Sequence, residues 1–113
     1  MISIIQNLYH RNEFVNETVR LNLLALEEAE VNYQYILFND NGDKDIYDDI
    51  KEFEDRVQYI YSDINYGHRM CTGGWVGAIP YIKGDYVHNF GQDDVMTKIF
   101  YKKSVEILDN NPD

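Results

Sequence analysis

Two short acidic stretches are the first places where this sequence could do chemistry. Asp93 and Asp94 are adjacent in the turn 91–94, directly after an apolar run. Their carboxylate oxygens are hard ligands that suit Mg²⁺ or Mn²⁺ when ligand phosphates complete the shell. Aspartates ahead of a helix also serve as caps, so spacing alone leaves metal binding and capping both open. The range 40–45 has the same ambiguity, and by itself a solvated turn explains it better.

The overall charge bears on which ligands such residues could take. Twenty acidic and ten basic side chains give a net charge of -10, a field that repels nucleic-acid phosphates and anionic lipid headgroups. We therefore expect no nucleic acid and no membrane surface among the partners. An acidic chain that binds phosphates needs a divalent cation between its carboxylates and the ligand, because direct contact would oppose like charges.

Length and composition indicate one folded domain. A chain of 113 residues allows a single core, and a hydrophobic fraction of 44% argues against disorder. Cys71 is the only cysteine, so a disulfide within the chain or a multi-cysteine zinc site is excluded, which fits a reducing compartment. The sequence has no signal-type leader and no apolar stretch near the roughly 20 residues of a membrane span, so we expect a cytoplasmic protein.

The acidic stretches lie between elements that alternate in type. Strands are predicted over 1–5, 31–38, 57–61 and 86–90, from β-rich or apolar runs. Helices are predicted over 13–26, 46–53 and 97–108, from apolar residues at helical spacing. Asn12 is the predicted cap of the first helix. A further helix face through Trp75, Ile79 and Ile82 is interrupted by Pro80.

This alternation is typical of an α/β fold with an open, mostly parallel sheet and flanking helices. Ligands of such sheets bind beyond the carboxyl ends of the strands. Four segments follow the predicted strands: 7–12, 39–43, 62–69 and 91–94. We therefore expect their side chains to converge on one site.

Four stretches of the sequence also follow one another in a known order: ISIIQNLYHRNEFVNETVRLNLLAL, YILFNDNGDKD, INYG and KGDYVHNFGQDDV. They resemble the signatures of the family 2 glycosyltransferases, whose GT-A fold contains a Rossmann-like nucleotide-binding half. In that family the first strand ends in a Tyr-Asn-Arg-like loop, the second in Asp-Asp-Gly-Ser and the fourth in the Asp-x-Asp region. The match covers essentially the whole chain, and its weight comes from the order of the motifs, since Asp-x-Asp alone is weak.

The resemblance implies a role for particular residues. The nucleotide-sugar-binding residues that it implies are Asn7, Tyr9, Arg11, Asp40, Asn41, Arg69, Gln92 and Asp93. Within this set the first three would line the nucleotide pocket, Asp40 and Asn41 would read the base, and Arg69 would contact phosphate. A flat aromatic wall and a directional hydrogen-bond partner are what a base requires.

The metal role also follows from the resemblance, with two departures from the family pattern. Asp93, Asp94 or both would hold Mn²⁺ or Mg²⁺, which acts as a Lewis acid on the departing diphosphate. Gly91 stands where the first Asp of the Asp-x-Asp motif usually lies. Asn41 replaces the second Asp of the base-reading pair, and because an amide both donates and accepts hydrogen bonds, the choice of base stays open.

The expected function is transfer of a sugar from a metal-bound nucleotide-diphospho-sugar to an acceptor glycan or another hydroxyl compound. The family's general base lies beyond the Asp-x-Asp region, so we expect residues 1–113 to form a donor-binding domain truncated at its C-terminus. A missing C-terminal half or a partner chain would complete it, and transfer by the isolated chain would be negligible. The alternative is a degenerate transferase half that acts as a binding or structural module. Gly91 and the truncation favour that alternative, whereas Tyr9 and the acidic pair favour nucleotide binding.

Overall fold

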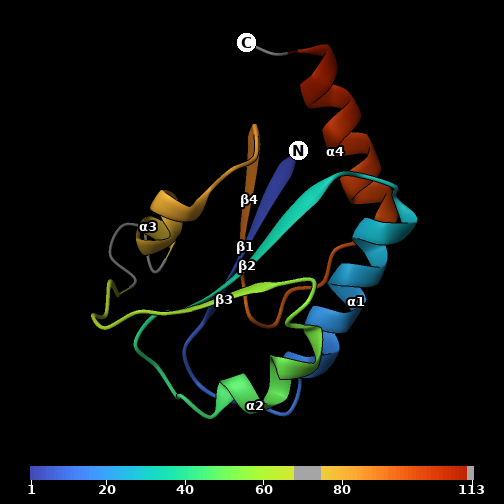
Figure 1. The fold of residues 1–113 in the computed structure, drawn as a ribbon. Coiled ribbons are helices and arrows are strands. Elements are labelled where there is room, and N and C mark those ends of the chain that lie inside the picture. Colours follow the sequence, from blue (N-terminus) through green and yellow to red (C-terminus); the bar gives the residue numbers. More distant parts are fainter. Residues whose placement is uncertain (68–74, 112–113) are drawn as a thin grey trace.

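The fold is built on a sheet of four parallel strands in the order β3-β2-β1-β4, which Figure 1 shows side by side. The computed structural model describes residues 1–67 and 75–111. The strands are β1 (Ile2–Leu8), β2 (Tyr33–Asn39), β3 (Gln58–Tyr61) and β4 (Tyr86–Gly91). The predicted α/β fold with a parallel sheet and flanking helices is confirmed.

The helices cover both faces of this sheet unequally. They are α1 (Val15–Glu28), α2 (Ile46–Ile50), α3 (Trp75–Ala78) and α4 (Lys98–Asn110), with 3₁₀ turns at Lys51–Phe53 and Ile79–Tyr81. In Figure 1, α1, α2 and α4 lie on one side of the strands and α3 lies on the other. Alternation along β1 accounts for this division, because successive side chains point to opposite faces. Ile2, Ile4 and Leu8 belong to the core under α1, whereas Ile5 packs with Ala78 of α3.

The first strand is longer than the sequence predicted, and its polar residues explain why. The polar cluster from Gln6 onward predicts that the strand ends at Ile5, yet Gln6 and Asn7 continue the ladder to both β2 and β4. Gln6 is fully buried, where its amide accepts a hydrogen bond from the Tyr35 hydroxyl at 2.6 Å. Burial raises the pKa of Tyr35, which keeps this hydroxyl protonated as the donor. A polar strand residue is stable here because its hydrogen bonds are satisfied.

The segment around Pro80 forms two short pieces instead of one helix, as the proline predicts. α3 ends at Ala78, and Pro80 lies in the 3₁₀ turn that follows. Trp75 and Ile82 pack against the cluster on the α3 side of the sheet, but Ile79 is 46% exposed. The three apolar residues therefore do not share one buried face.

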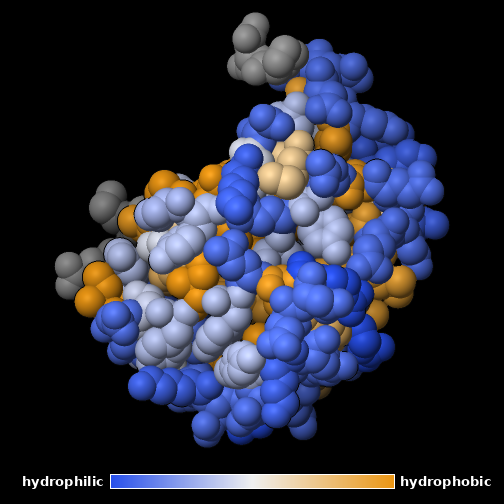
Figure 2. All heavy atoms as spheres, viewed as in Figure 1, coloured by the Kyte–Doolittle hydropathy of each residue, from blue (hydrophilic) through white to orange (hydrophobic). Residues whose placement is uncertain are grey.

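The outer surface is mostly polar, as the charge of the chain requires. Figure 2 shows hydrophilic residues over much of the visible face, with apolar atoms between them. Within the described ranges, no helix has the length and apolar character needed to cross a bilayer.

Candidate functional site

Parallel pairing brings the ends of all four strands to one edge of the sheet. Leu8 of β1 is level with Asn39 of β2, and Asn39 is level with Tyr61 of β3. On the other side, Asn7 is level with Gly91 of β4. The loops after the four strands therefore leave the same edge, as predicted. Arg69, expected in the third of these segments, lies outside the described residues.

The first and second loops are joined through their backbones. The Asp43 N–H donates to the Tyr9 carbonyl oxygen at 2.7 Å, and the Gly42 N–H donates to Asn39 Oδ1 at 2.8 Å. A Cβ atom on Gly42 would lie 1.9 Å from the same Tyr9 oxygen. Only glycine allows this approach, so the Asn-Gly step in the second motif serves the contact between two loops.

The second loop is joined to the third through the residues predicted to read a base. Asp40 is 6% exposed, and its two carboxylate oxygens accept the N–H groups of Tyr66 at 2.7 Å and Gly67 at 3.1 Å. Asn41 has a φ of 59°, a conformation that asparagine tolerates better than most residues, and its Nδ2 donates to the Ser62 carbonyl at 3.0 Å. Both side chains hold the third loop in place. Each Asp40 oxygen can still accept a second hydrogen bond.

An aromatic residue that received no role from the sequence lies beside Asp40. The Tyr66 ring is tilted against Phe38 with the ring centroids 6.1 Å apart, and Tyr66 is 38% exposed. Gly77 allows this arrangement, because a Cβ atom there would lie 2.4 Å from the Phe38 ring and 2.6 Å from the Tyr66 ring. The INYG stretch could have indicated Tyr66, because it places an aromatic residue directly before a glycine in the loop after a predicted strand. A partly exposed ring next to a carboxylate suits the face and edge of a base.

The first and fourth loops are joined by Gln92. Its Oε1 accepts the Tyr9 N–H at 3.0 Å, and its Nε2 donates to the His10 carbonyl at 2.6 Å. The Gln92 carbonyl accepts from Gln6 Nε2 and from Thr18 Oγ1, both at 3.0 Å. Gln6 is a residue that the sequence analysis missed. The alternation Ile2, Ile4, Gln6, Leu8 could have indicated that Gln6 lies on the same face of the strand as these apolar residues.

Asn7 carries the one polar atom of this edge that is buried and unpaired within the described residues. Its Nδ2 donates to Asn89 Oδ1 at 2.6 Å and to the Phe90 carbonyl at 3.0 Å, while its Oδ1 has no partner there. Buried acceptors without a partner are uncommon, because the lost hydration is not replaced. Asn7 Oδ1 is therefore a buried acceptor that the described residues leave without a hydrogen bond.

The two aspartate side chains of the turn after β4 are exposed. Asp94 Oδ2 accepts the Gly91 N–H at 3.0 Å, and Asp93 Oδ1 accepts from Asn12 Nδ2 at 3.1 Å. Helix capping does not explain this pair, since the α4 cap is Thr97, whose side chain accepts the Phe100 N–H. Metal binding by this turn stays a prediction.

The turn fits a divalent cation only in part. Each aspartate keeps a second carboxylate oxygen with no hydrogen bond among the described residues, and such oxygens suit Mn²⁺ or Mg²⁺. However, in the part of the chain that the structure describes, no three His, Cys, Asp or Glu residues are grouped to hold a metal ion. An ion here would therefore need oxygens from a bound ligand.

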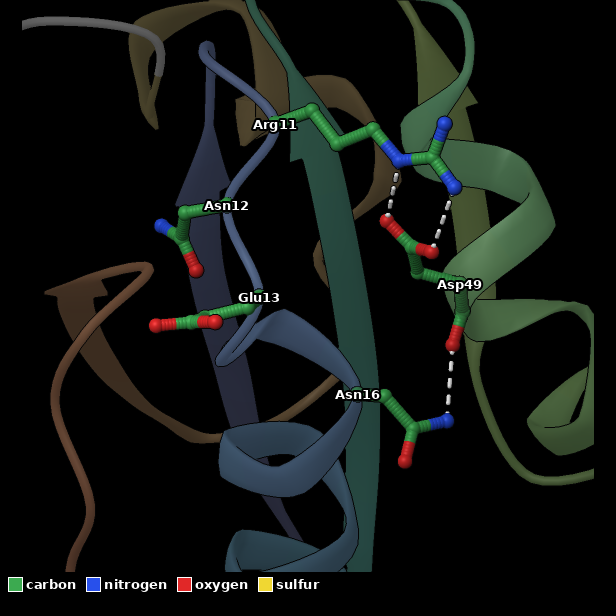
Figure 3. Close-up of a pocket in the computed structure, with 5 residues that line it drawn as sticks. All are labelled: Arg11, Asn12, Glu13, Asn16 and Asp49. Carbon is green, nitrogen blue, oxygen red and sulfur yellow. Dashed lines mark hydrogen bonds and ion pairs between the residues drawn. The ribbon is translucent and has the colours of Figure 1, made fainter.

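Arg11 points to α2 in this structure. Its Nε and Nη2 atoms each donate to an Asp49 carboxylate oxygen at 2.9 Å, as Figure 3 shows. The hydrogen bond and charge of Asp49 raise the pKa of Arg11. The two residues line an open pocket of about 360 Å³ together with Asn12, Glu13 and Asn16. The guanidinium is thus engaged by α2, whereas Asp40 is engaged by the third loop.

Of the comparisons with known proteins, only the one with solved structures finds similar proteins. No protein-family model matches the sequence, and no curated protein matches it. Among solved structures, S. aureus TarS is similar with a TM-score of 0.72 and 14% identity, over 96% of this chain and 19% of that chain. The chain shares the fold of the part of TarS that it matches.

Two of the similar TarS structures contain ligands. TarS 1–349 in complex with UDP-GlcNAc has a TM-score of 0.72 and 13% identity, over 96% of this chain and 31% of that chain. TarS 1–349 in complex with UDP has a TM-score of 0.70 and 15% identity, over 96% of this chain and 32% of that chain. The present chain thus spans a fifth to a third of the length of the TarS chains that it matches.

Proposed function

We propose that this chain is the donor-binding half of a glycosyltransferase and binds a nucleotide-diphospho-sugar at the carboxyl edge of its sheet. The observation that carries the proposal is the convergence of four polar loops at that edge, joined to one another by Gly42, Asp40 and Gln92. The shared fold supports it, because TarS is a glycosyltransferase whose structures include complexes with UDP-GlcNAc and UDP. Family 2 membership rests on the ordered motifs of the sequence.

The nucleotide base would lie near the second and third loops. Tyr66 and Tyr9 offer aromatic surface, and the remaining lone pairs of Asp40 can accept from a base N–H. Asn41 would contribute through its carbonyl oxygen and through the second hydrogen of its amide nitrogen, since the other hydrogen already donates to Ser62. Asn7 would lie at the same end of the sheet, with an Oδ1 atom that the described residues leave without a hydrogen bond.

The diphosphate would lie near the fourth loop, with Mn²⁺ or Mg²⁺ shared between Asp93, Asp94 and the phosphate oxygens. When bound, the ion would neutralise the diphosphate as it leaves. The residues of this chain would supply the two exposed carboxylates and fix their turn through Gln92 and Asn12. Without the ion, the carboxylates and the net charge of -10 would repel the phosphates.

Sugar transfer would require parts that these residues do not provide. The acceptor, a glycan or another hydroxyl compound, must lose a proton to a positioned general base. No residue of this chain has been assigned that role. A missing C-terminal half or a partner chain would supply the base and shield the site from water. We expect the isolated chain to bind the donor and to show negligible transfer.

Calorimetric titration of the isolated chain with UDP and with UDP-GlcNAc tests this proposal. We expect binding with Mn²⁺ present and at least about tenfold weaker binding in chelator, because the ion bridges like charges. The double variant Asp93→Asn, Asp94→Asn should lose most of the affinity and its dependence on metal. The matched control is Asp48→Asn, Asp55→Asn, which removes the same charge from exposed aspartates elsewhere. Equal binding in chelator would contradict the metal role, and no binding of either ligand would contradict the proposed function.

A second candidate function is a non-catalytic binding or structural module derived from a transferase. Gly91 favours it, because that position lacks the carboxylate usual in the motif. The variant Gly91→Asp separates the two candidates. Among the described residues, a Cβ atom at Gly91 meets only Asp94 Oδ2, at 3.5 Å, which is an ordinary contact distance. In a donor-binding site the third carboxylate should tighten Mn²⁺-dependent UDP binding, whereas a module without a metal site should be unaffected.

A further inference from the structure

One buried side chain of α1 holds the backbone of the acidic turn. Asn22 is 0% exposed. Its Nδ2 donates to the Asp94 carbonyl oxygen at 2.9 Å, and its Oδ1 accepts the Met96 N–H at 2.8 Å. Among the described residues, neither of these backbone groups has another hydrogen-bond partner. A single amide therefore satisfies both of them, because it has a donor side and an acceptor side.

Two further buried side chains hold the chain just before the acidic pair. Thr18 precedes Asn22 by one helical turn, on the same face of α1. Gln6 of β1 lies beside it, with Nε2 at 3.3 Å from Thr18 Oγ1. Both side chains donate to the Gln92 carbonyl at 3.0 Å. The segment between β4 and α4, which passes α1 in Figure 1, is thus bonded on both sides of the two aspartates.

The polarity of position 22 is explained by these bonds. Val19, Leu23 and Leu26 of the same helix are apolar and fully buried. An amide buried among such residues costs free energy unless its hydrogen bonds are made. The turn supplies partners for the Asn22 amide, whereas a leucine there would pack without holding the turn. The polar residue therefore serves the turn and not the helix.

We propose that Asn22 is a positioning residue for the diphosphate end of the donor site, an inference that rests on the proposed function. Because Asn22 is buried, it acts through the backbone and not by contact with the ligand. It fixes the segment from which the Asp93 and Asp94 side chains extend into solvent. A site ordered in advance loses less conformational freedom on binding. Partners that orient metal ligands commonly change metal affinity by about 10–100-fold.

Titrations of UDP with Mn²⁺ and in chelator test this role in Asn22→Leu, which removes both hydrogen bonds. The measured quantity is the ratio of the UDP dissociation constant in chelator to that with Mn²⁺, because a loss of stability does not change this ratio in a folded protein. We expect the ratio to fall about tenfold. The control is Val19→Ala, which destabilises the same helix by shortening a side chain of the apolar core. Its ratio should equal that of the unmodified chain, and circular dichroism should show that both variants are folded.

Thr18 allows a rescue experiment that does not depend on Asn22→Leu. Thr18→Val removes the hydroxyl near the Gln92 carbonyl, and Thr18→Ser keeps it. We expect the ratio to fall in Thr18→Val and to return in Thr18→Ser. The fall should be smaller than in Asn22→Leu, since Gln6 still donates to the same carbonyl. A hydroxyl that only stabilises the fold would lower the unfolding temperature of Thr18→Val and leave the ratio unchanged.

Hydrogen exchange of the Met96 N–H, followed by NMR, measures how the turn is held when no ligand is present. Exchange should be slow in the unmodified chain and at least about tenfold faster in Asn22→Leu, because the acceptor is lost. Faster exchange with an unchanged ratio would overturn the positioning role and leave the proposed function intact. Unchanged exchange in Asn22→Leu would overturn it as well. If the unmodified chain does not bind UDP, both the inference and the proposed function are wrong.

Discussion

The loop after β2 and the turn after β4 both place aspartates at the carboxyl edge of the sheet, but the two differ in what those aspartates do. Asp40 is buried, and each of its carboxylate oxygens accepts a backbone N–H of the third loop. Asp93 and Asp94 are exposed, and each carboxylate accepts a single hydrogen bond among the described residues. In the loop after β2, the Asp40 carboxylate holds the backbone of the third loop. The turn after β4 leaves carboxylate oxygens available to a ligand.

Strand order explains the difference. β2 lies between β1 and β3, so the loop that follows it has a neighbouring loop on each side and bonds to both. Among the described residues, β4 pairs with β1 alone, so the turn after it meets another strand-end loop on one side. A side chain surrounded by backbone groups becomes part of the packing, whereas one at the edge stays solvated. Substitutions in the two places should therefore differ in their effect on stability.

Gly42→Ala should have the largest effect. The new Cβ atom would meet the Tyr9 carbonyl oxygen at 1.9 Å, so the first two loops must separate, and we expect a loss of at least about 3 kcal/mol in the free energy of unfolding. Urea denaturation followed by circular dichroism measures this loss. Gly91→Ala is the control in the other loop and should cost no more than about 1 kcal/mol. Similar losses for the two variants would show that the loops are equally rigid.

Asp40→Asn should have the next largest effect. The amide keeps one acceptor oxygen, but its NH₂ group would face a backbone N–H, so Tyr66 or Gly67 loses its partner. We expect a cost of about 1–3 kcal/mol. Asp63→Asn makes the same change of charge at an exposed position of the third loop and should be close to neutral. Equal stabilities of these two variants, measured by thermal unfolding, would mean that Asp40 does not hold the loop.

Asn41→Asp should have a smaller effect on stability and a measurable effect on ligand choice. The substitution opposes a carboxylate oxygen to the Ser62 carbonyl, which now accepts from Nδ2, at a cost of about 1 kcal/mol. Because the change turns a group that donates and accepts into an acceptor only, the relative affinities for different nucleoside diphosphates should shift. Asn41→Gly is the control, since it fits the φ of 59° and adds no charge. Unchanged relative affinities would place Asn41 outside the base contact.

Asp93→Asn should have the smallest effect on stability. The side chain is exposed and keeps an oxygen that can accept from Asn12, so the free energy of unfolding should change by less than about 0.5 kcal/mol. The affinity for UDP in the presence of Mn²⁺ should nevertheless fall, because the variant loses a proposed metal ligand. Parallel unfolding and calorimetric titrations on the same sample check both parts. A large loss of stability would show that the turn is structural, like the loop after β2.

Much of the architecture could be predicted from the sequence, because strand and helix periodicities are local properties of the chain. The apolar runs of β2 and β4 and the helical spacing of α1 and α4 fixed the order of elements and hence the edge where the loops meet. The end of β1 was predicted wrongly. Gln6 looks like a loop residue until Tyr35 and the Gln92 carbonyl, which are distant in sequence, supply its hydrogen bonds.

Within the site, the sequence determined which polar residues follow which strand, and it did so through residue types and motif order. It named Asp40, Asn41, Gln92 and the acidic pair at this edge, but it could not separate structural carboxylates from available ones. That distinction was decided only by the tertiary structure. It depends on whether a neighbouring loop brings backbone N–H groups within hydrogen-bond distance, as Tyr66 and Gly67 do for Asp40. Such contacts join residues that are far apart in the sequence, and their spacing along the chain does not indicate their distance in space.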